Sequence, residues 1–123
     1  MLDKVLRIAK LYDFYGALLT ERQRQCIEMH YLSDLSLGEI ANEQKVSRQA
    51  VHDILRRAEQ LLEDYEAKLC LVARNEQERR ELLRIASLLG SLPAEQQAIP
   101  AISESQRILA RLLDGEGRDT DGV

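Results

Sequence analysis

The chain has 123 residues, 45% hydrophobic and 31% charged, a balance typical of a single globular domain with or without an extension. The 21 acidic residues exceed the 17 basic ones, which gives a formal net charge of −4. With no Trp, one Phe and four Tyr, single-strand nucleic-acid binding through stacked aromatic side chains is not expected. Two cysteines are too few for a disulfide framework or a zinc knuckle.

The first fifteen residues predict an amphipathic helix, and the following segments begin with local capping signals. We expect helices over 2–15 and 21–32, the second opened by the capping box Thr20-Glu-Arg-Gln23. A second capping box, Ser36-Leu-Gly-Glu39, opens a third helix. No window shows the two-residue alternation of a strand, so the predicted fold is all-α.

The stretch from Ser36 to Gln60 has the pattern of a helix, a short turn and a second helix. Small Ala41 allows a close crossing of the two helices, Val46 fills the turn, and Ser47 caps the second helix. A left-handed residue in the turn has to be Gln44 or Lys45, at a cost of about 1 kcal/mol relative to glycine. The sequence therefore predicts a helix-turn-helix.

The helix that starts after Ser47 carries an apolar stripe of six turns or more. Its members are Val51, Ile54, Leu55, Ala58, Leu61, Leu62, Tyr65, Leu69 and Val72. This stripe is longer than a 40-residue core can cover, so we expect its far half to need another surface. A second copy of the chain is one candidate. Fold-back of the C-terminal helices is the other.

The C-terminal third is predicted to be helical with a break. Asn75 begins a possible capping box, either at a new helix or within a continuing one. Residues 90–102 contain both prolines and are predicted to be a linker, and Ser103 to Leu113 a short amphipathic helix opened by a further box. We assign a helix-turn-helix domain to residues 1–70, a helical extension for dimerisation to 71–113, and a disordered tail to 114–123.

The outward arc at the start of the second motif helix has side chains suited to duplex DNA. The candidate DNA-binding residues are Ser47, Arg48, Gln49, His52, Arg56 and Arg57. Arg binds guanine edges or phosphates, Gln pairs with adenine, and a capped helix N-terminus favours a phosphate. The next turns are acidic, with Glu59, Glu63, Asp64 and Glu66, so duplex contact should be confined to residues 47–57. The carboxylates of Glu63 and Asp64 are interpreted as part of a solvated charged face.

No other group of residues indicates chemistry. His30 and His52 lack metal-ligand spacing, no catalytic triad or glycine-rich phosphate loop is visible, and neither a catalytic site, a cofactor nor a metal is expected. The charged start of the chain is not a signal peptide, and the longest apolar run, 69–73, is far below the roughly 20 residues of a membrane span. We expect a cytoplasmic protein that is not an enzyme.

Four pieces of the sequence resemble the YlxM-like family of small bacterial helix-turn-helix proteins: DFYGALLTERQ, SLGEIA, VSRQAVHD and LLEDYEAKL. The resemblance covers about half of the chain, and the motif is more distantly similar to region four of bacterial sigma factors. The resemblance to the YlxM-like family implies an all-helical cytoplasmic protein. It also implies, through gene neighbourhood, a link to the signal recognition particle pathway. The sigma-like match implies base or phosphate contacts at Arg48, Gln49, His52 and Arg56. Where the family tends to have Gly, this chain has Cys70, which predicts a continuous helix there.

Two functional hypotheses follow. The first is a transcription regulator that binds duplex DNA as a homodimer and has a role in the signal recognition particle pathway. The second is an adaptor that acts on the GTPase or RNA of that particle, with the helix-turn-helix as a scaffold. Over residues 20–57 six basic and six acidic residues cancel, which weakens the electrostatic case for DNA.

Overall fold

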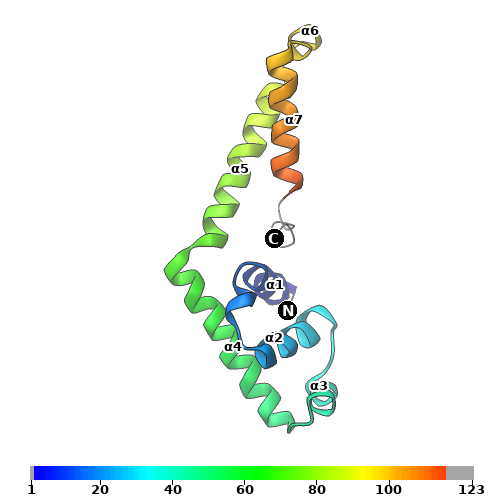
Figure 1. The fold of residues 1–123 in the computed structure, drawn as a ribbon, viewed down its shortest axis with the longest axis vertical. Helices are drawn as coiled ribbons and strands as arrows, with labels where there is room; N and C mark the ends of the chain where they lie inside the picture. Colours follow the sequence, from blue (N-terminus) through cyan, green and yellow to red (C-terminus); the bar gives the residue numbers. More distant parts are fainter. Residues whose placement is uncertain (1, 116–123) are drawn as a thin grey trace. The chain divides into compact units, whose positions relative to one another are not determined.

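The computed structural model describes residues 2–115. These residues form α1 (Leu2–Tyr15), a 3-10 turn (Gly16–Leu18), α2 (Glu21–Ile27), a π-helical turn (Glu28–Leu32), α3 (Leu37–Gln44), α4 (Arg48–Leu69), α5 (Leu71–Gly90), α6 (Ala94–Gln97) and α7 (Pro100–Asp114). The described part contains no strand, and the predicted all-α class is confirmed. The chain divides into two compact units, the first ending at Val72 and the second beginning at Ala73 (Figure 1).

The capping boxes predicted at Thr20 and Ser36 are both present. The Thr20 hydroxyl accepts the Gln23 N–H at 3.2 Å while the Gln23 side chain accepts the Thr20 N–H at 3.0 Å. The Ser36 hydroxyl accepts the Glu39 N–H at 3.1 Å, and the Glu39 carboxylate accepts the Ser36 N–H at 2.8 Å. These reciprocal bonds satisfy N–H groups that no helical carbonyl can reach, so α2 and α3 begin where the sequence predicts.

The second predicted helix keeps its span, 21–32, but changes geometry after Ile27. Residues 28–32 form a π turn, in which the Ser33 N–H bonds to the Glu28 carbonyl at 2.9 Å. The Leu35 N–H then bonds to the Met29 carbonyl at 2.9 Å. The wider turn therefore closes the end of this helix through bonds that a regular α-helix does not form.

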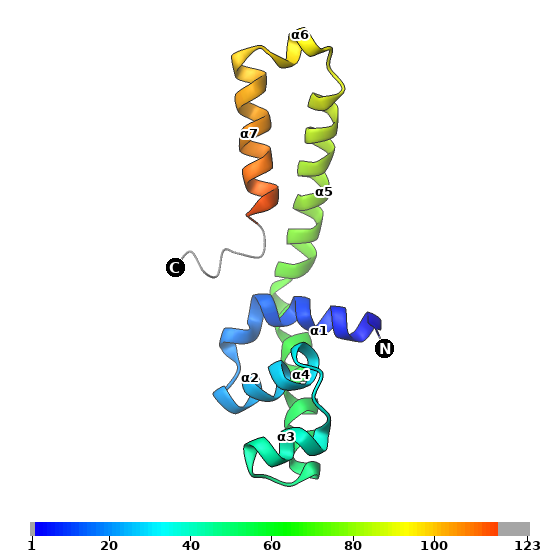
Figure 2. The same ribbon diagram turned by 90° about the vertical axis from the view of Figure 1, so that its right-hand side faces the viewer.

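The core of the first unit lies between α4 and the three helices before it. Its buried residues are Ile8, Leu11, Tyr15, Leu19, Cys26, Ile27, Ile40, Ala41, Val51, Leu55, Ala58, Leu62 and Val72. Figure 2 shows α1 crossing α4, with α2 and α3 beside the earlier turns of α4. Helix α1 thus covers the middle of the α4 stripe. The sequence had suggested a second copy of the chain or the C-terminal helices as the cover, and not α1. Leu62 and Val72 are buried within this unit, so they are unavailable to a second copy, whereas Leu69 is 48% exposed.

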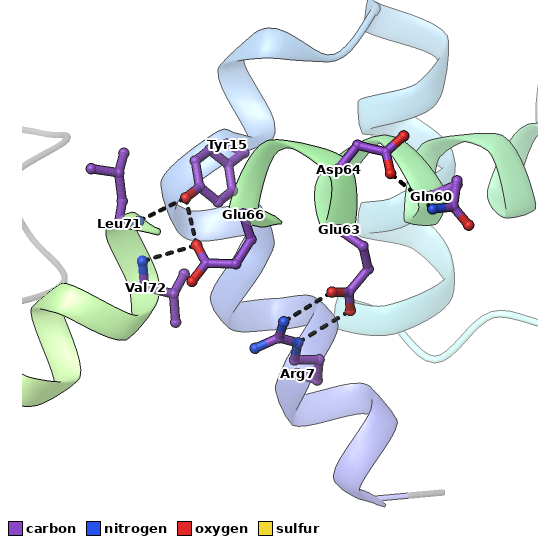
Figure 3. Close-up of polar contacts among 8 residues, drawn as sticks. All are labelled: Arg7, Tyr15, Gln60, Glu63, Asp64, Glu66, Leu71 and Val72. Atoms are coloured by element: carbon purple, nitrogen blue, oxygen red, sulfur yellow. Dashed lines mark hydrogen bonds and ion pairs between the residues drawn. The ribbon is translucent and has the colours of Figure 1, made fainter. Parts of the chain in front are cut away.

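The helix does not continue through Cys70, so that prediction is wrong. Cys70 adopts a left-handed conformation with φ of 57°, and α4 ends at Leu69. The Tyr15 hydroxyl accepts the Leu71 N–H at 3.0 Å, and the Glu66 carboxylate accepts the Val72 N–H at 3.1 Å (Figure 3). Two side chains thus replace the helical carbonyls as acceptors for the first N–H groups of α5.

The second unit is a hairpin of α5 and α7 joined through α6. Asn75 lies inside α5, so the helix is continuous there. The predicted linker, 90–102, contains the short helix α6 and the start of α7. Helix α7 begins at Pro100 rather than Ser103, because proline suits the first helical position and Ser103 N–H already bonds to the Ile99 carbonyl. The box predicted at Ser103 is therefore not a helix start.

The predicted tail starts one residue early. Asp114 is the last residue of α7 and Gly115 its C-cap. The remainder of the predicted disordered tail, residues 116–123, lies outside the described residues.

Candidate nucleic-acid interface

The turn of the helix-turn-helix is built from local backbone bonds. Lys45 takes the left-handed conformation with φ of 57°, as the sequence allowed for it or Gln44. The N–H groups of Lys45 and Val46 both bond back to the Ala41 carbonyl, the latter at 3.1 Å. This closes α3 in a form usually made by glycine and directs the chain into α4.

The start of α4 has a buried side and an exposed side. Val51 and Leu55 are buried in the core, and the Ser47 hydroxyl accepts the Ala50 N–H at 3.0 Å as the N-cap. The six candidate residues are all exposed: Ser47, Arg48, Gln49, His52, Arg56 and Arg57. The motif therefore presents these polar side chains to solvent, while the N-cap fixes where the helix begins.

Asp53 organises the centre of this exposed side. Its carboxylate accepts a hydrogen bond from the Gln49 amide at 3.0 Å and lies 3.6 Å from His52 Nδ1. The Asp53 carboxylate orients the Gln49 amide, because the NH2 group donates to Asp53 and the amide carbonyl stays available. A protonated His52 would also form an ion pair with Asp53, so both candidate residues are coupled to one acid.

The candidate residues fall into two groups in space. Arg48, Gln49 and His52 line a shallow hollow with Leu37 at the start of α3. Arg57 lines another hollow with Thr20 and Arg22 at the start of α2. Two helix N-termini, those of α2 and α3, therefore border the exposed side of α4, and N-termini favour negatively charged ligands.

Arg56 and Arg57 also line a larger hollow between α4 and α1. Its wall includes Lys4, Arg7, Ile8, Asp53, Arg56, Arg57, Glu59, Gln60 and Glu63. Helix α1 thus adds cationic side chains beside the second turn of the recognition surface, here defined as the exposed residues of 47–57. No local pattern predicts that α1 lies beside α4, although Lys4 and Arg7 share a helix face at i, i+3 spacing.

The acidic residues Glu59 and Glu63, beyond Arg57, are engaged by α1 and by the π-helical turn. The Glu63 carboxylate accepts two hydrogen bonds from Arg7, at 2.9 and 3.1 Å (Figure 3). Glu59 lies 3.2 Å from the Lys4 ammonium and accepts a hydrogen bond from the Tyr31 hydroxyl. The interpretation of Glu63 as plain surface solvation is therefore wrong, because a bidentate guanidinium partially neutralises it.

Glu66 also differs from its predicted role. It is 8% exposed, and its carboxylate accepts the Tyr15 hydroxyl at 2.5 Å as well as the Val72 N–H. Burial and this hydrogen bond raise the pKa of Tyr15 above 10.0. Glu66 is thus part of the core, not of the acidic surface that borders the recognition surface. Asp64 remains exposed and accepts a hydrogen bond from Gln60 at 2.9 Å.

Residues 2–115 contain no cluster of metal ligands and no membrane-spanning helix. No group of three or more His, Cys, Asp or Glu side chains there is arranged to hold a metal ion. None of the helices in that range combines the length and the apolar character that crossing a bilayer requires.

Comparison with known proteins identifies a family. Residues 2–103 match the UPF0122 family, described as "Putative helix-turn-helix protein, YlxM / p13 like". A UPF0122 protein of Desulforamulus reducens is 47% identical over 108 residues, 88% of this chain and 92% of that protein. Those of Halalkalibacterium halodurans and Shouchella clausii are 49% and 53% identical, over 85% and 74% of this chain and 95% and 84% of their own lengths.

Proposed function

We propose that this chain, which belongs to the UPF0122 family of YlxM/p13-like helix-turn-helix proteins, binds duplex DNA as a homodimer and regulates transcription. The recognition surface at the start of α4 makes the contacts. A helix-turn-helix family suggests a binding protein rather than an enzyme. The proposal includes a cytoplasmic location and, from the family resemblance, a role in the signal recognition particle pathway.

One observation carries the proposal. The exposed side of α4 presents arginine, glutamine and histidine at its N-terminal turns, while the first two acidic residues beyond them are paired with cations of α1. An α-helix fits the major groove, where Arg binds guanine and Gln binds adenine through paired hydrogen bonds. The arrangement therefore provides donors for base edges without an unpaired carboxylate at Glu59 or Glu63.

Positive charge is concentrated around the start of α4, although the chain as a whole is acidic. Residues 45–57 contain four cationic side chains (Lys45, Arg48, Arg56 and Arg57) and one carboxylate, that of Asp53. The local charge is therefore +3 in a chain of net −4. Two copies on one duplex would double this charge, and two linked half-sites bind far more tightly than either alone.

A titration of labelled duplex fragments tests the proposal. Arg48→Ala and Arg56→Ala should each weaken binding, by about 1–3 kcal/mol for a base contact or with a salt slope smaller by about 1 for a phosphate contact. Arg107→Ala, an equal change of charge at an exposed position of α7, is the matched control. Gln49→Ala should alter the preferred sequence more than the overall affinity.

The result that would refute DNA binding is specific. If the wild type shows no sequence preference and both α4 variants bind as the Arg107 variant does, the recognition surface makes no DNA contact. The adaptor hypothesis then replaces it, and a pull-down with the signal recognition particle GTPase and RNA becomes the decisive measurement.

A further inference from the structure

The α5–α7 hairpin has almost no core of its own. Among its described residues, 73–115, only Leu109 is buried. Helices α5 and α7 run side by side in opposite directions (Figure 2) and are joined by a bond from Arg79 to the Leu113 carbonyl at 3.1 Å. Segments of about 40 residues need a metal, disulfides or an oligomer to be stable, so this hairpin requires a further apolar surface.

Most of the exposed apolar residues of the hairpin lie on one side, with Leu83 and Ile99 outside this group. On α7, a single stripe lies beside the residues that face α5. It consists of Ala101, Ser105, Ile108 and Leu112, at spacings of four, three and four. On α5, Ile85 and Leu88 are exposed and lie on the same side of the hairpin as the α7 stripe. Together they define the hairpin face: Ile85, Leu88, Ala101, Ser105, Ile108 and Leu112. This face crosses both helices, and on α5 Glu81 continues it one turn before Ile85.

The charges at its edge balance. The helical period places Glu81 and Arg84 of α5, and Glu104 and Arg111 of α7, beside the hairpin face. Two acids and two bases give a net charge of zero. A strongly charged partner would gain nothing from such an edge, whereas an identical copy can place each acid near a base. The charge pattern therefore favours self-association.

We propose that the hairpin face binds the same face of a second copy, so that two hairpins form a four-helix bundle. Helix α7 has 15 residues and is therefore about 22 Å long. Two faces of that length, each two helices wide, bury on the order of 1,000 Å², near the lower range for specific interfaces. The bundle supplies the core that one hairpin lacks, and its packing is the ordinary packing of four-helix bundles.

This inference deepens the proposed function by assigning the surface that forms the homodimer. It keeps the expected interface on the extension 71–113 and removes the far half of α4 from it, since Leu62 is buried in the core of the first unit. The two proposals nevertheless fail separately. A dimer that binds no duplex refutes DNA binding alone, and a monomer that binds duplex refutes the bundle alone.

Sedimentation velocity of the full chain between about 5 and 100 μM tests the bundle, with a dimer as the expected result. Leu88→Glu combined with Ile108→Glu should yield a monomer, with the dissociation constant raised 100-fold or more, because each dimer loses four buried side chains. Leu83→Glu is the control, since Leu83 is as exposed as Leu88 (46% and 51%) but lies on the opposite side of α5. A monomeric wild type, or equal dissociation of both variants, overturns the proposal.

Cysteine cross-linking tests the same geometry without disturbing the apolar residues. In a Cys70→Ser background, Ser105→Cys on the hairpin face should form a disulfide-linked dimer under mild oxidation. Ser87→Cys, on the opposite side of α5, should remain unlinked. Linking at residue 87 but not at residue 105 would show that a different face forms the dimer.

Discussion

Replacement of Tyr15 by phenylalanine removes one hydroxyl from the junction of α4 and α5. That hydroxyl donates to the Glu66 carboxylate at 2.5 Å and accepts the Leu71 N–H at 3.0 Å. The Tyr15 ring is 1% exposed, so water does not replace the hydroxyl at Glu66, which is itself buried. Leu71 is 40% exposed, so its N–H can bond to water instead.

The expected cost follows from these two bonds. A hydrogen bond to a charged group contributes about 1.5–3 kcal/mol, and the hydrated N–H adds little. We therefore expect Tyr15→Phe to lower the free energy of unfolding by about 2–3 kcal/mol. In urea, where small proteins show slopes of about 1–3 kcal/mol per molar, the midpoint should fall by about 1 M or more.

The measurement is urea unfolding followed by far-UV circular dichroism at one protein concentration, since self-association changes apparent stability. Tyr65→Phe is the matched control. The Tyr65 ring lies 5.9 Å from that of Tyr15, but Tyr65 is only partly buried, so water can solvate its hydroxyl. Its loss should cost less than about 0.5 kcal/mol. A Tyr15→Phe variant as stable as Tyr65→Phe would refute the role assigned to the buried carboxylate.

Three further outcomes are expected. Ser36→Ala should destabilise the chain by about 1 kcal/mol through loss of the α3 cap, measured by thermal unfolding; an unchanged midpoint would contradict the cap's importance. Cys70→Gly should stabilise the chain by up to about 1 kcal/mol, because Cys70 is left-handed. Lys68→Gly, inside α4, should destabilise the chain by about as much. A change of the same sign in both variants would contradict this expectation. Burial and hydrogen bonds to carboxylates raise the pKa of Tyr12 and Tyr31 above 10.0, so the stability they contribute should be complete below pH 10 and fall above it. A stability curve that stays flat up to pH 12 would contradict that contribution.

Local sequence patterns determined the starts of α2, α3 and α4. Each capping box joins residues three apart, so the bonds at Thr20 and Ser36 depend on no distant part of the chain. The left-handed turn at Lys45 and the cap at Ser47 are equally local. The helix-turn-helix could therefore be recognised before any tertiary contact was known, and family membership agrees with it.

The candidate site was only partly accessible to the same reasoning. A helical wheel separates exposed Arg48 and Gln49 from buried Val51, because the period of 3.6 residues is a property of the helix alone. It does not show that Arg7 binds Glu63 from 56 residues away, or that Lys4 lies against Glu59. The sequence therefore predicted the polar types of the recognition surface but not how far the neighbouring acids are neutralised.

The end of α4 was decided by tertiary structure. From Arg48 onward the apolar stripe continues past Cys70 to Val72, and by periodicity the helix should continue too. Packing of α1 on α4 brings the Tyr15 hydroxyl to the Glu66 carboxylate, and these two groups satisfy the N–H groups of Leu71 and Val72. A helix ends where other acceptors replace its own carbonyls, and here those acceptors come from side chains that only the folded chain brings together.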